Sequence, residues 1–139
     1  MKRPGERGVS AVEFALLLPL FLLILFGIIE FSMLIYDKQL ITNASRQGAR
    51  AGIVSQSPRL TTDDIQSLIT DSLKDDNGNW RLITFASWKE GPVVTVPSAC
   101  TESGDSLQVT VGYQYNFLVL KAFGIPGPYL TSSTTMTCE

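Results

Sequence analysis

Two glutamates flank the most apolar stretch of this chain, the segment FALLLPLFLLILFGII. Glu13 directly precedes this segment and Glu30 directly follows it. An ionised carboxylate at the centre of a bilayer costs about 2.5–3.5 kcal/mol on insertion scales, and less near an interface. A glutamate beside a membrane segment is therefore a candidate functional residue. The role we expect for its carboxylate is pairing with a positive charge.

Other kinds of chemistry find little support. The chain has no histidine, so the usual Ser/His and Cys/His arrangements cannot form, and neither Ser-x-x-Lys nor Gly-x-Ser-x-Gly occurs. We therefore expect no enzymatic activity and no cofactor. The net charge of −2 argues against binding to nucleic acid, which requires clustered Lys and Arg.

One short segment has the alternating spacing of a calcium loop, with Asp75, Asn77 and Asn79 as its polar residues. Trp80 stands where the glycine of such a loop should be, and no glutamate occupies the closing position. A solvated turn is the better interpretation, and no metal site is expected.

The apolar segment has the length of a membrane span. A span needs about 20 predominantly apolar residues, and a helix from Glu13 to Glu30 covers roughly 25 Å of a hydrocarbon layer about 30 Å thick. Basic residues precede the segment, so the N-terminus should stay in the cytoplasm and the remainder should be exported; these residues are Lys2, Arg3 and Arg7. A cleaved secretory signal is the alternative, but no Ala-x-Ala-like site follows the segment.

This topology decides how the two cysteines are interpreted. In a reducing cytosol Cys100 and Cys138 would be two separate thiols, whereas an even pair outside it indicates one disulfide. Because the residues after the span are expected to be exported, we predict a disulfide between them.

Helical periodicity continues beyond the span to about Ile53. Small residues recur one turn apart at Ala44, Gly48 and Gly52, and a face of this kind lets another backbone approach closely. Arg46 and Arg50 lie on a neighbouring face, where they are either solvated or paired with acidic residues of another subunit. We expect one long helix, half in the membrane and half packed on an exported head.

The rest of the chain predicts a short helix followed by strands. In TTDDIQSLITDSLKDD, Thr61 or Thr62 caps a helix whose apolar stripe contains Ile65, Leu68, Ile69 and Leu73. The later segments are β-branched and aromatic with alternating polarity, namely WRLITFASW, PVVTVPSAC, SLQVTVGYQYNF and YLTSSTTMTC. This order predicts an α+β fold with a mostly antiparallel sheet laid on the long helix.

The stretch from Phe117 to Ile125 is unusual for a connection, because Lys121 is its only charge. Three interpretations stay open: it fills the core of the head, it lies at the membrane surface, or it docks another protein.

The N-terminal segments resemble a known family. GVSAVEF followed by an apolar helix resembles the prepilin motif of type IV pilins, and RGVSAVEFALLLPLFLLILFGIIEF with ASRQGARAG resembles TadE-like minor pilins of the tight-adherence (Tad, or Flp) pilus. The ending YQYNFLVL…LTSSTTMTCE is also similar to the close of that domain. The resemblance implies a pilin-like fold and a role as a minor pilin, or pseudopilin. Such a subunit would prime the assembly of an adhesive type IV pilus, form its tip, or act as an accessory subunit.

The resemblance also implies how the chain is divided and processed. Residues 1–8 are a basic leader, residues 9–30 the membrane part of the helix, and residues 31–139 the extracytoplasmic head. A prepilin peptidase would cut between Gly8 and Val9, and Glu13 would pair with the new ammonium group of a neighbouring subunit. Glu30 is expected at the outer membrane interface.

The same resemblance implies a place in the cell. The partners would be other pilins of the same pilus, the prepilin peptidase, the inner-membrane assembly platform and the lipid bilayer. The protein would cross the bacterial inner membrane once with its head in the periplasm, or enter the extracellular pilus. The rival interpretation is an uncleaved, membrane-anchored extracytoplasmic binding module, which the N-terminus of the mature chain would distinguish.

Overall fold

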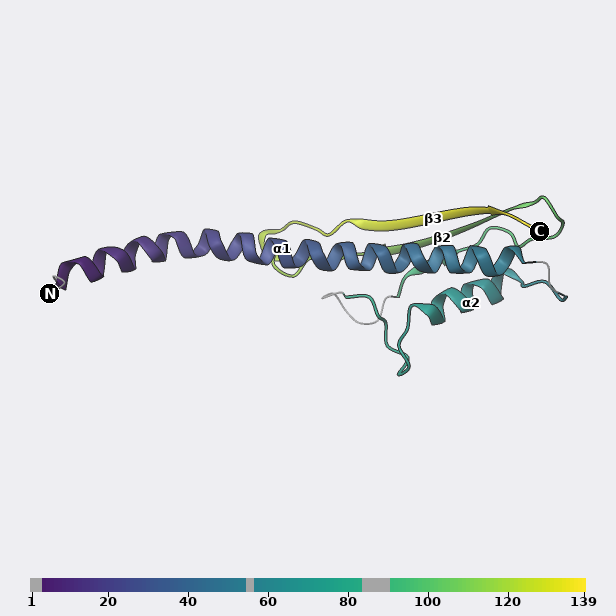
Figure 1. The fold of residues 1–139 in the computed structure, drawn as a ribbon, viewed down its shortest axis with the longest axis horizontal. Helices are drawn as coiled ribbons and strands as arrows, with labels where there is room; N and C mark the ends of the chain where they lie inside the picture. The colour runs from purple at the N-terminus through teal and green to yellow at the C-terminus, as the bar shows by residue number, and fades with distance from the viewer. Residues whose placement is uncertain (1–3, 55–56, 84–90) are drawn as a thin grey trace.

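A single long helix organises the whole molecule. The computed structural model describes residues 4–54, 57–83 and 91–139, and α1 (Pro4–Ile53) contains 50 of them. The N-terminal half of α1 stands alone as a bare rod, while every other element gathers around its C-terminal half (Figure 1). Among the described residues this is the one helix long and apolar enough to cross a membrane.

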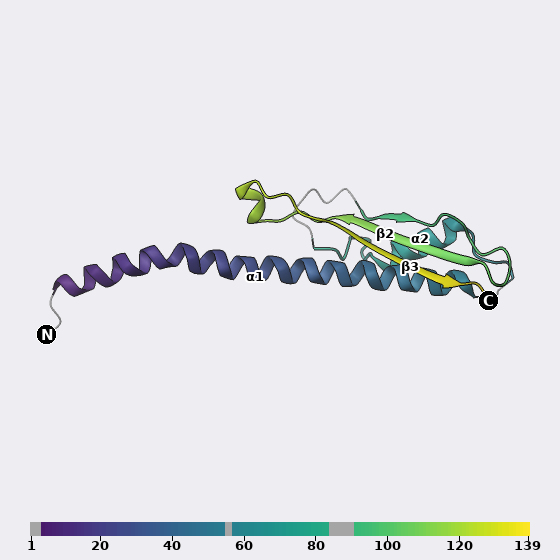
Figure 2. The same cartoon turned by 90° about the horizontal axis from the view of Figure 1, so that it is seen from above.

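The head is α+β, as the sequence predicts. α2 (Thr62–Ser72) packs on α1, and so does a sheet in which β1 (Val93–Thr95), β2 (Ser106–Gln114) and β3 (Tyr129–Thr137) are antiparallel in the order β1-β2-β3. β2 and β3 run along the helix rather than across it (Figure 2). A short 3-10 helix, η1 (Leu120–Phe123), lies in the connection between β2 and β3.

The core lies where the sheet and α2 meet the C-terminal half of α1. Alternate residues of β2 face it, and Leu107, Val109 and Val111 are fully buried. From α2, Ile65 and Ile69 complete the contact. The strict alternation seen in the sequence is therefore the inner face of the central strand.

Local capping explains where α2 begins. The Thr61 side chain accepts a hydrogen bond from the Asp64 backbone N–H, and the Asp64 carboxylate accepts one from the Thr61 backbone N–H. This capping box satisfies two donors at the start of the helix. The hydrogen bonds, that of the Thr61 hydroxyl first, lower the pKa of Asp64.

The strand expected at WRLITFASW does not begin at Trp80. Trp80 forms an isolated bridge with Lys74, whose ammonium lies 5.1 Å from the indole ring, and the Arg81 N–H donates to the carbonyl of Leu73. These contacts fold the segment back on the end of α2, so its first residues do not pair with the sheet. Residues 84–90 of the expected strand lie outside the described residues.

The turn that joins these segments is held by one aspartate. The Asp75 carboxylate accepts hydrogen bonds from the backbone N–H groups of Asn77 and Asn79, at 3.0 and 2.8 Å. Hydrogen bonds, chiefly that from the Asn79 N–H, lower the pKa of Asp75. The spacing that resembled a calcium loop is thus an Asx-type turn.

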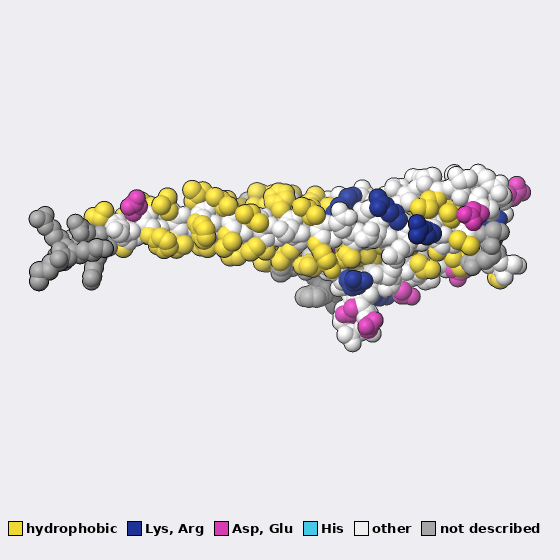
Figure 3. Space-filling view, viewed as in Figure 1, with side chains coloured by type: hydrophobic (Ala, Val, Ile, Leu, Met, Phe, Trp, Pro, Cys, Tyr) yellow, Lys and Arg dark blue, Asp and Glu magenta, His cyan; other side chains and the backbone are white. Residues whose placement is uncertain are grey.

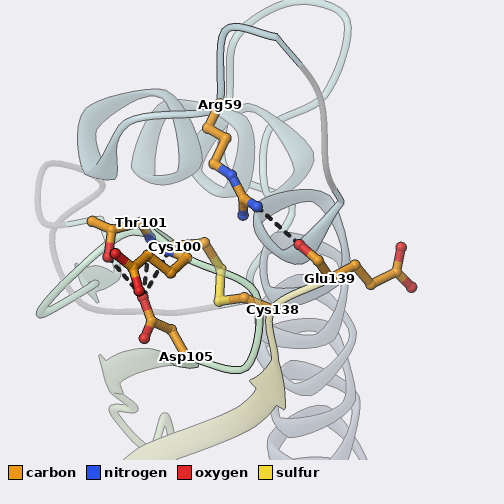
Figure 4. The surroundings of a disulfide bond; sticks show 7 residues. Arg59, Cys100, Thr101, Asp105, Cys138 and Glu139 are labelled. Carbon is orange, nitrogen blue, oxygen red and sulfur yellow. Dashed lines mark hydrogen bonds between the residues drawn. A yellow bond between two sulfur atoms is a disulfide. The ribbon is translucent and has the colours of Figure 1, made fainter.

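The predicted disulfide closes the end of the head farthest from the bare rod. Cys100 and Cys138 are bonded, with their Cα atoms 5.9 Å apart (Figure 4). The Glu139 N–H donates to the carbonyl of Ile53 at the end of α1, and Arg59, in the connection between α1 and α2, donates to the carbonyl of Glu139.

Removing the disulfide should weaken the head. The double variant Cys100→Ser/Cys138→Ser is expected to lose about 4 kcal/mol of unfolding free energy, because a loop of about forty residues is no longer closed in the unfolded chain. Urea unfolding of the full chain in detergent, followed by tryptophan fluorescence, measures the loss, and Ser98→Ala at an exposed position is the control. Free thiols in wild-type protein alkylated without reductant would contradict the prediction.

Candidate functional site

The two glutamates of α1 lie in opposite environments. Glu13 is exposed in the bare half of the helix, where hydrophobic side chains cover the surface of the rod (Figure 3). Within residues 4–54, 57–83 and 91–139, no hydrogen-bond or ion-pair partner of its carboxylate is found.

Glu30 is buried, with 3% of its surface exposed. Its carboxylate accepts hydrogen bonds from the backbone N–H groups of Leu118, Val119 and Leu120, the last two at 2.8 and 3.3 Å. These N–H groups precede and begin η1, so they have no acceptor within the turn. The carboxylate supplies that acceptor, and charge-assisted bonds of this kind are stronger than neutral ones.

A second contact joins the backbone of Glu30 to the sheet. The Tyr115 hydroxyl, at the buried end of the segment that follows β2, donates to the Glu30 carbonyl at 3.4 Å. Burial first, and then the negative charges of Asp37 and Glu30, raise the pKa of Tyr115 to about 12. The phenol therefore remains a hydrogen-bond donor at all physiological pH values.

A third acidic residue, Asp37, is fully buried beyond the apolar segment, where α1 is covered by the head. One carboxylate oxygen accepts the Ile83 N–H at 2.8 Å, and the other has no hydrogen-bond partner among the described residues. Burial raises the pKa of Asp37 to about 6, against the opposing effect of the Ile83 N–H. Sequence reasoning missed this residue, although its position one turn from both Met33 and Ile41 on the apolar stripe was the signal.

The small-residue face of α1 lies against the head of the same chain. A Cβ atom added to Gly48 would stand 2.3 Å from Cδ1 of Ile69, and one added to Gly52 would stand 2.5 Å from Cδ2 of Leu107. Ala44, on the same face, is also buried. These positions let α2 and β2 approach the helix backbone closely.

A polar contact that the sequence did not reveal runs beside this face. The hydroxyl of the buried Ser45 lies 3.1 Å from the Ser132 hydroxyl and 2.9 Å from that of Thr134, both on β3. On the outer side of the helix, Arg46 and Arg50 are exposed and line a shallow groove with Asn43, Gln47 and Met136. The solvated interpretation of the two arginines fits this placement.

The residues of the expected cleavage site lie within the helix. Gly8 and Val9 are exposed in the N-terminal part of α1, which begins at Pro4. A Cβ atom added to Gly8 would meet no atom within 4 Å. Packing within the described residues therefore gives no reason for a glycine at this position.

Comparison with known proteins agrees with the resemblance found in the sequence. The model of the TadE-like protein family matches residues 8–50, which confirms that resemblance. No curated protein matches the chain, and neither does any solved structure. The match begins at Gly8, includes both glutamates, and ends in the part of α1 that packs on the head. It associates the chain with the proteins of the tight-adherence pilus.

A larger side chain at Gly48, where α2 approaches the backbone of α1 closely, should destabilise the packing of the head on the helix. Gly48→Val is expected to lower the unfolding free energy by about 2–3 kcal/mol, because the new side chain overlaps the buried Ile69. Gly27→Val is the matched control, since a Cβ atom there meets nothing within 4 Å. Urea midpoints of both variants in detergent test this, and equal midpoints would show that head and helix are not packed so closely.

Proposed function

We propose that this chain, whose residues 8–50 match the TadE-like protein family, is a minor pilin that takes part in the assembly of a tight-adherence pilus. It would act as a priming, tip or accessory subunit, and its role would be structural rather than enzymatic. The observation that carries the proposal is the exposed carboxylate of Glu13 on a bare apolar helix, for which the described residues provide no partner.

The proposed route begins with insertion into the inner membrane. The basic leader keeps residues 1–8 in the cytoplasm, and the head is delivered to the periplasm. A prepilin peptidase then cuts between Gly8 and Val9. Gly8 has open space around it and no packing role within the described residues. The lack of a side chain at this position is therefore better explained by recognition by a peptidase than by the fold.

Cleavage would also create the partner that Glu13 needs. The cut leaves an ammonium group on Val9, about one helical turn before Glu13, so both charges of a subunit lie near the same end of the bare half of α1. Two subunits in register can match the ammonium of one with the carboxylate of the other. A neighbour out of register leaves two unpaired charges in a medium of low dielectric constant, which is strongly unfavourable.

The head would then serve as the outward face of the assembled subunit. Because the small-residue face of α1 is covered by α2 and β2, contacts with other pilins are expected along the bare half of the helix and over the outer surface of the head. The assembly platform of the inner membrane would extract the subunit from the bilayer once the leader is gone.

The rival is an uncleaved membrane-anchored module. The observation that favours it is the continuity of α1 from Pro4 through Val9, which makes the uncut chain an ordinary single-span anchor. In that case Glu13 has no ammonium to pair with, and its replacement has no effect on other pilins.

Replacing Glu13 separates these two functions. Glu13→Ala should insert into the membrane at least as well as wild type, because it removes a charge from the apolar stretch. Its co-purification with other pilins of the same pilus should fall about hundredfold, since leaving one partner of a buried ion pair unmatched costs roughly 3 kcal/mol or more.

The control is Glu102→Ala, which removes an exposed carboxylate from the head. Quantitative immunoblotting of sheared pili and of membrane fractions measures both variants. Equal incorporation of Glu13→Ala and wild type would contradict the pilin function.

A further inference from the structure

The connection between β2 and β3 exposes apolar side chains that the core does not use. Phe117 is buried against Tyr115, with the two rings edge to face at a centroid distance of 5.5 Å. Beyond it, Leu118 is 52% exposed, Phe123 67% and Ile125 46%. Water-soluble surfaces rarely gather apolar side chains in one short segment without a binding role.

The position of this connection in the fold indicates what its exposed apolar side chains contact. It lies at the end of the sheet that faces the bare half of α1, whereas the disulfide and the chain end lie at the other (Figure 2). Leu118 and Val119 line a small crevice together with Phe26, Ile29, Glu30 and Met33 of α1, and the surface exposed in it is mostly apolar. The apolar surface of the connection therefore continues that of the membrane segment.

The connection lies at the height along α1 where the boundary of a bilayer is expected. From Val9 to Glu30 the helix rises about 32 Å, close to a hydrocarbon thickness of about 30 Å. Glu30 holds the backbone of the connection through its contacts with Leu118, Val119 and Leu120. The segment is thus fixed where the outer headgroups of the bilayer begin.

The internal hydrogen bonds suit a place with little water. Besides the three N–H groups that Glu30 accepts, the Gly124 N–H donates to the Lys121 carbonyl and the Ile125 N–H donates to the Leu120 carbonyl. Gly124 makes this closure with a φ of 76°, in the left-handed region. Backbone groups paired in this way can enter an interface without losing hydrogen bonds.

We propose that residues 118–125 form a membrane foot that rests on the outer surface of the bilayer beside the span. Leu118, Phe123 and Ile125 enter the boundary between headgroups and acyl chains, and the ammonium of Lys121 lies at the lipid phosphates. A lysine among apolar and aromatic residues is the composition that membrane interfaces favour. The foot requires only that α1 spans the membrane, and neither cleavage at Gly8 nor pilus assembly is needed for it.

Lipid quenching of a fluorophore tests the foot in the full chain. The protein is reconstituted into vesicles of phosphatidylethanolamine and phosphatidylglycerol with lipids that carry a nitroxide near the headgroup. A nitrobenzoxadiazole label is placed on Phe123→Cys, and on Thr135→Cys, an exposed position of β3, as the control. Quenching of the Phe123 label is expected to be at least threefold stronger than that of the control label.

Two further variants test how the foot is held. Glu30→Gln, combined with the Phe123 label, should reduce lipid quenching at least twofold, because the neutral amide is a weaker acceptor for the three N–H groups. Lys121→Glu places a negative charge on an exposed residue that does not support the fold. It should also reduce lipid quenching, and more so as the share of phosphatidylglycerol rises.

Two results would overturn the proposal. Equal lipid quenching of the Phe123 and Thr135 labels would place the connection in water. A Phe123 label that is shielded from a water-soluble quencher but not quenched by nitroxide lipids would mean that a protein neighbour covers the segment instead. Neither result bears on the pairing of Glu13, so the pilin proposal stands or falls separately.

Discussion

The carboxylate of Glu30 marks the point where one helix passes from one environment to another. On its N-terminal side the apolar side chains of α1 are bare, and on its C-terminal side the helix is covered by the head. A charge at such a boundary is strongly unfavourable unless it is hydrogen-bonded. Three backbone N–H groups of the β2–β3 connection meet that requirement, so the same interaction solvates the charge and attaches the head to α1.

The head is fastened to α1 at both of its ends and along its length. At the end beside the bare half of α1 the contact is made by Glu30, and at the far end the Glu139 N–H donates to the Ile53 carbonyl beside the Cys100–Cys138 disulfide. Between them, Gly48 lets α2 approach the helix backbone closely. These contacts, spread along α1, set the orientation of the head on the helix.

Local sequence signals predicted the elements because their causes are local. Capping at Thr61 and the alternation of β2 depend on neighbours in the chain, and both were confirmed. The sequence placed Glu30 at the end of the apolar segment, but its acceptor role depends on Leu118, 88 residues away, which no periodicity reveals. The beginning of the expected strand at Trp80 was wrong for a different reason, since a nearby contact with Lys74 folds this segment back on the end of α2.

Glu13 lies on the same helix as Glu30 but differs from it in one respect. Its carboxylate has no partner among the described residues. We propose that its partner appears only when the leader is removed between Gly8 and Val9. The most direct measurement is N-terminal sequencing of the protein from membranes and pili of cells that assemble the pilus, beside a Gly8→Arg variant that blocks the cut. We expect that wild type begins at Val9 and that the variant keeps its leader and forms no pili. Wild-type protein that retains Met1 or Lys2 in piliated cells would contradict it.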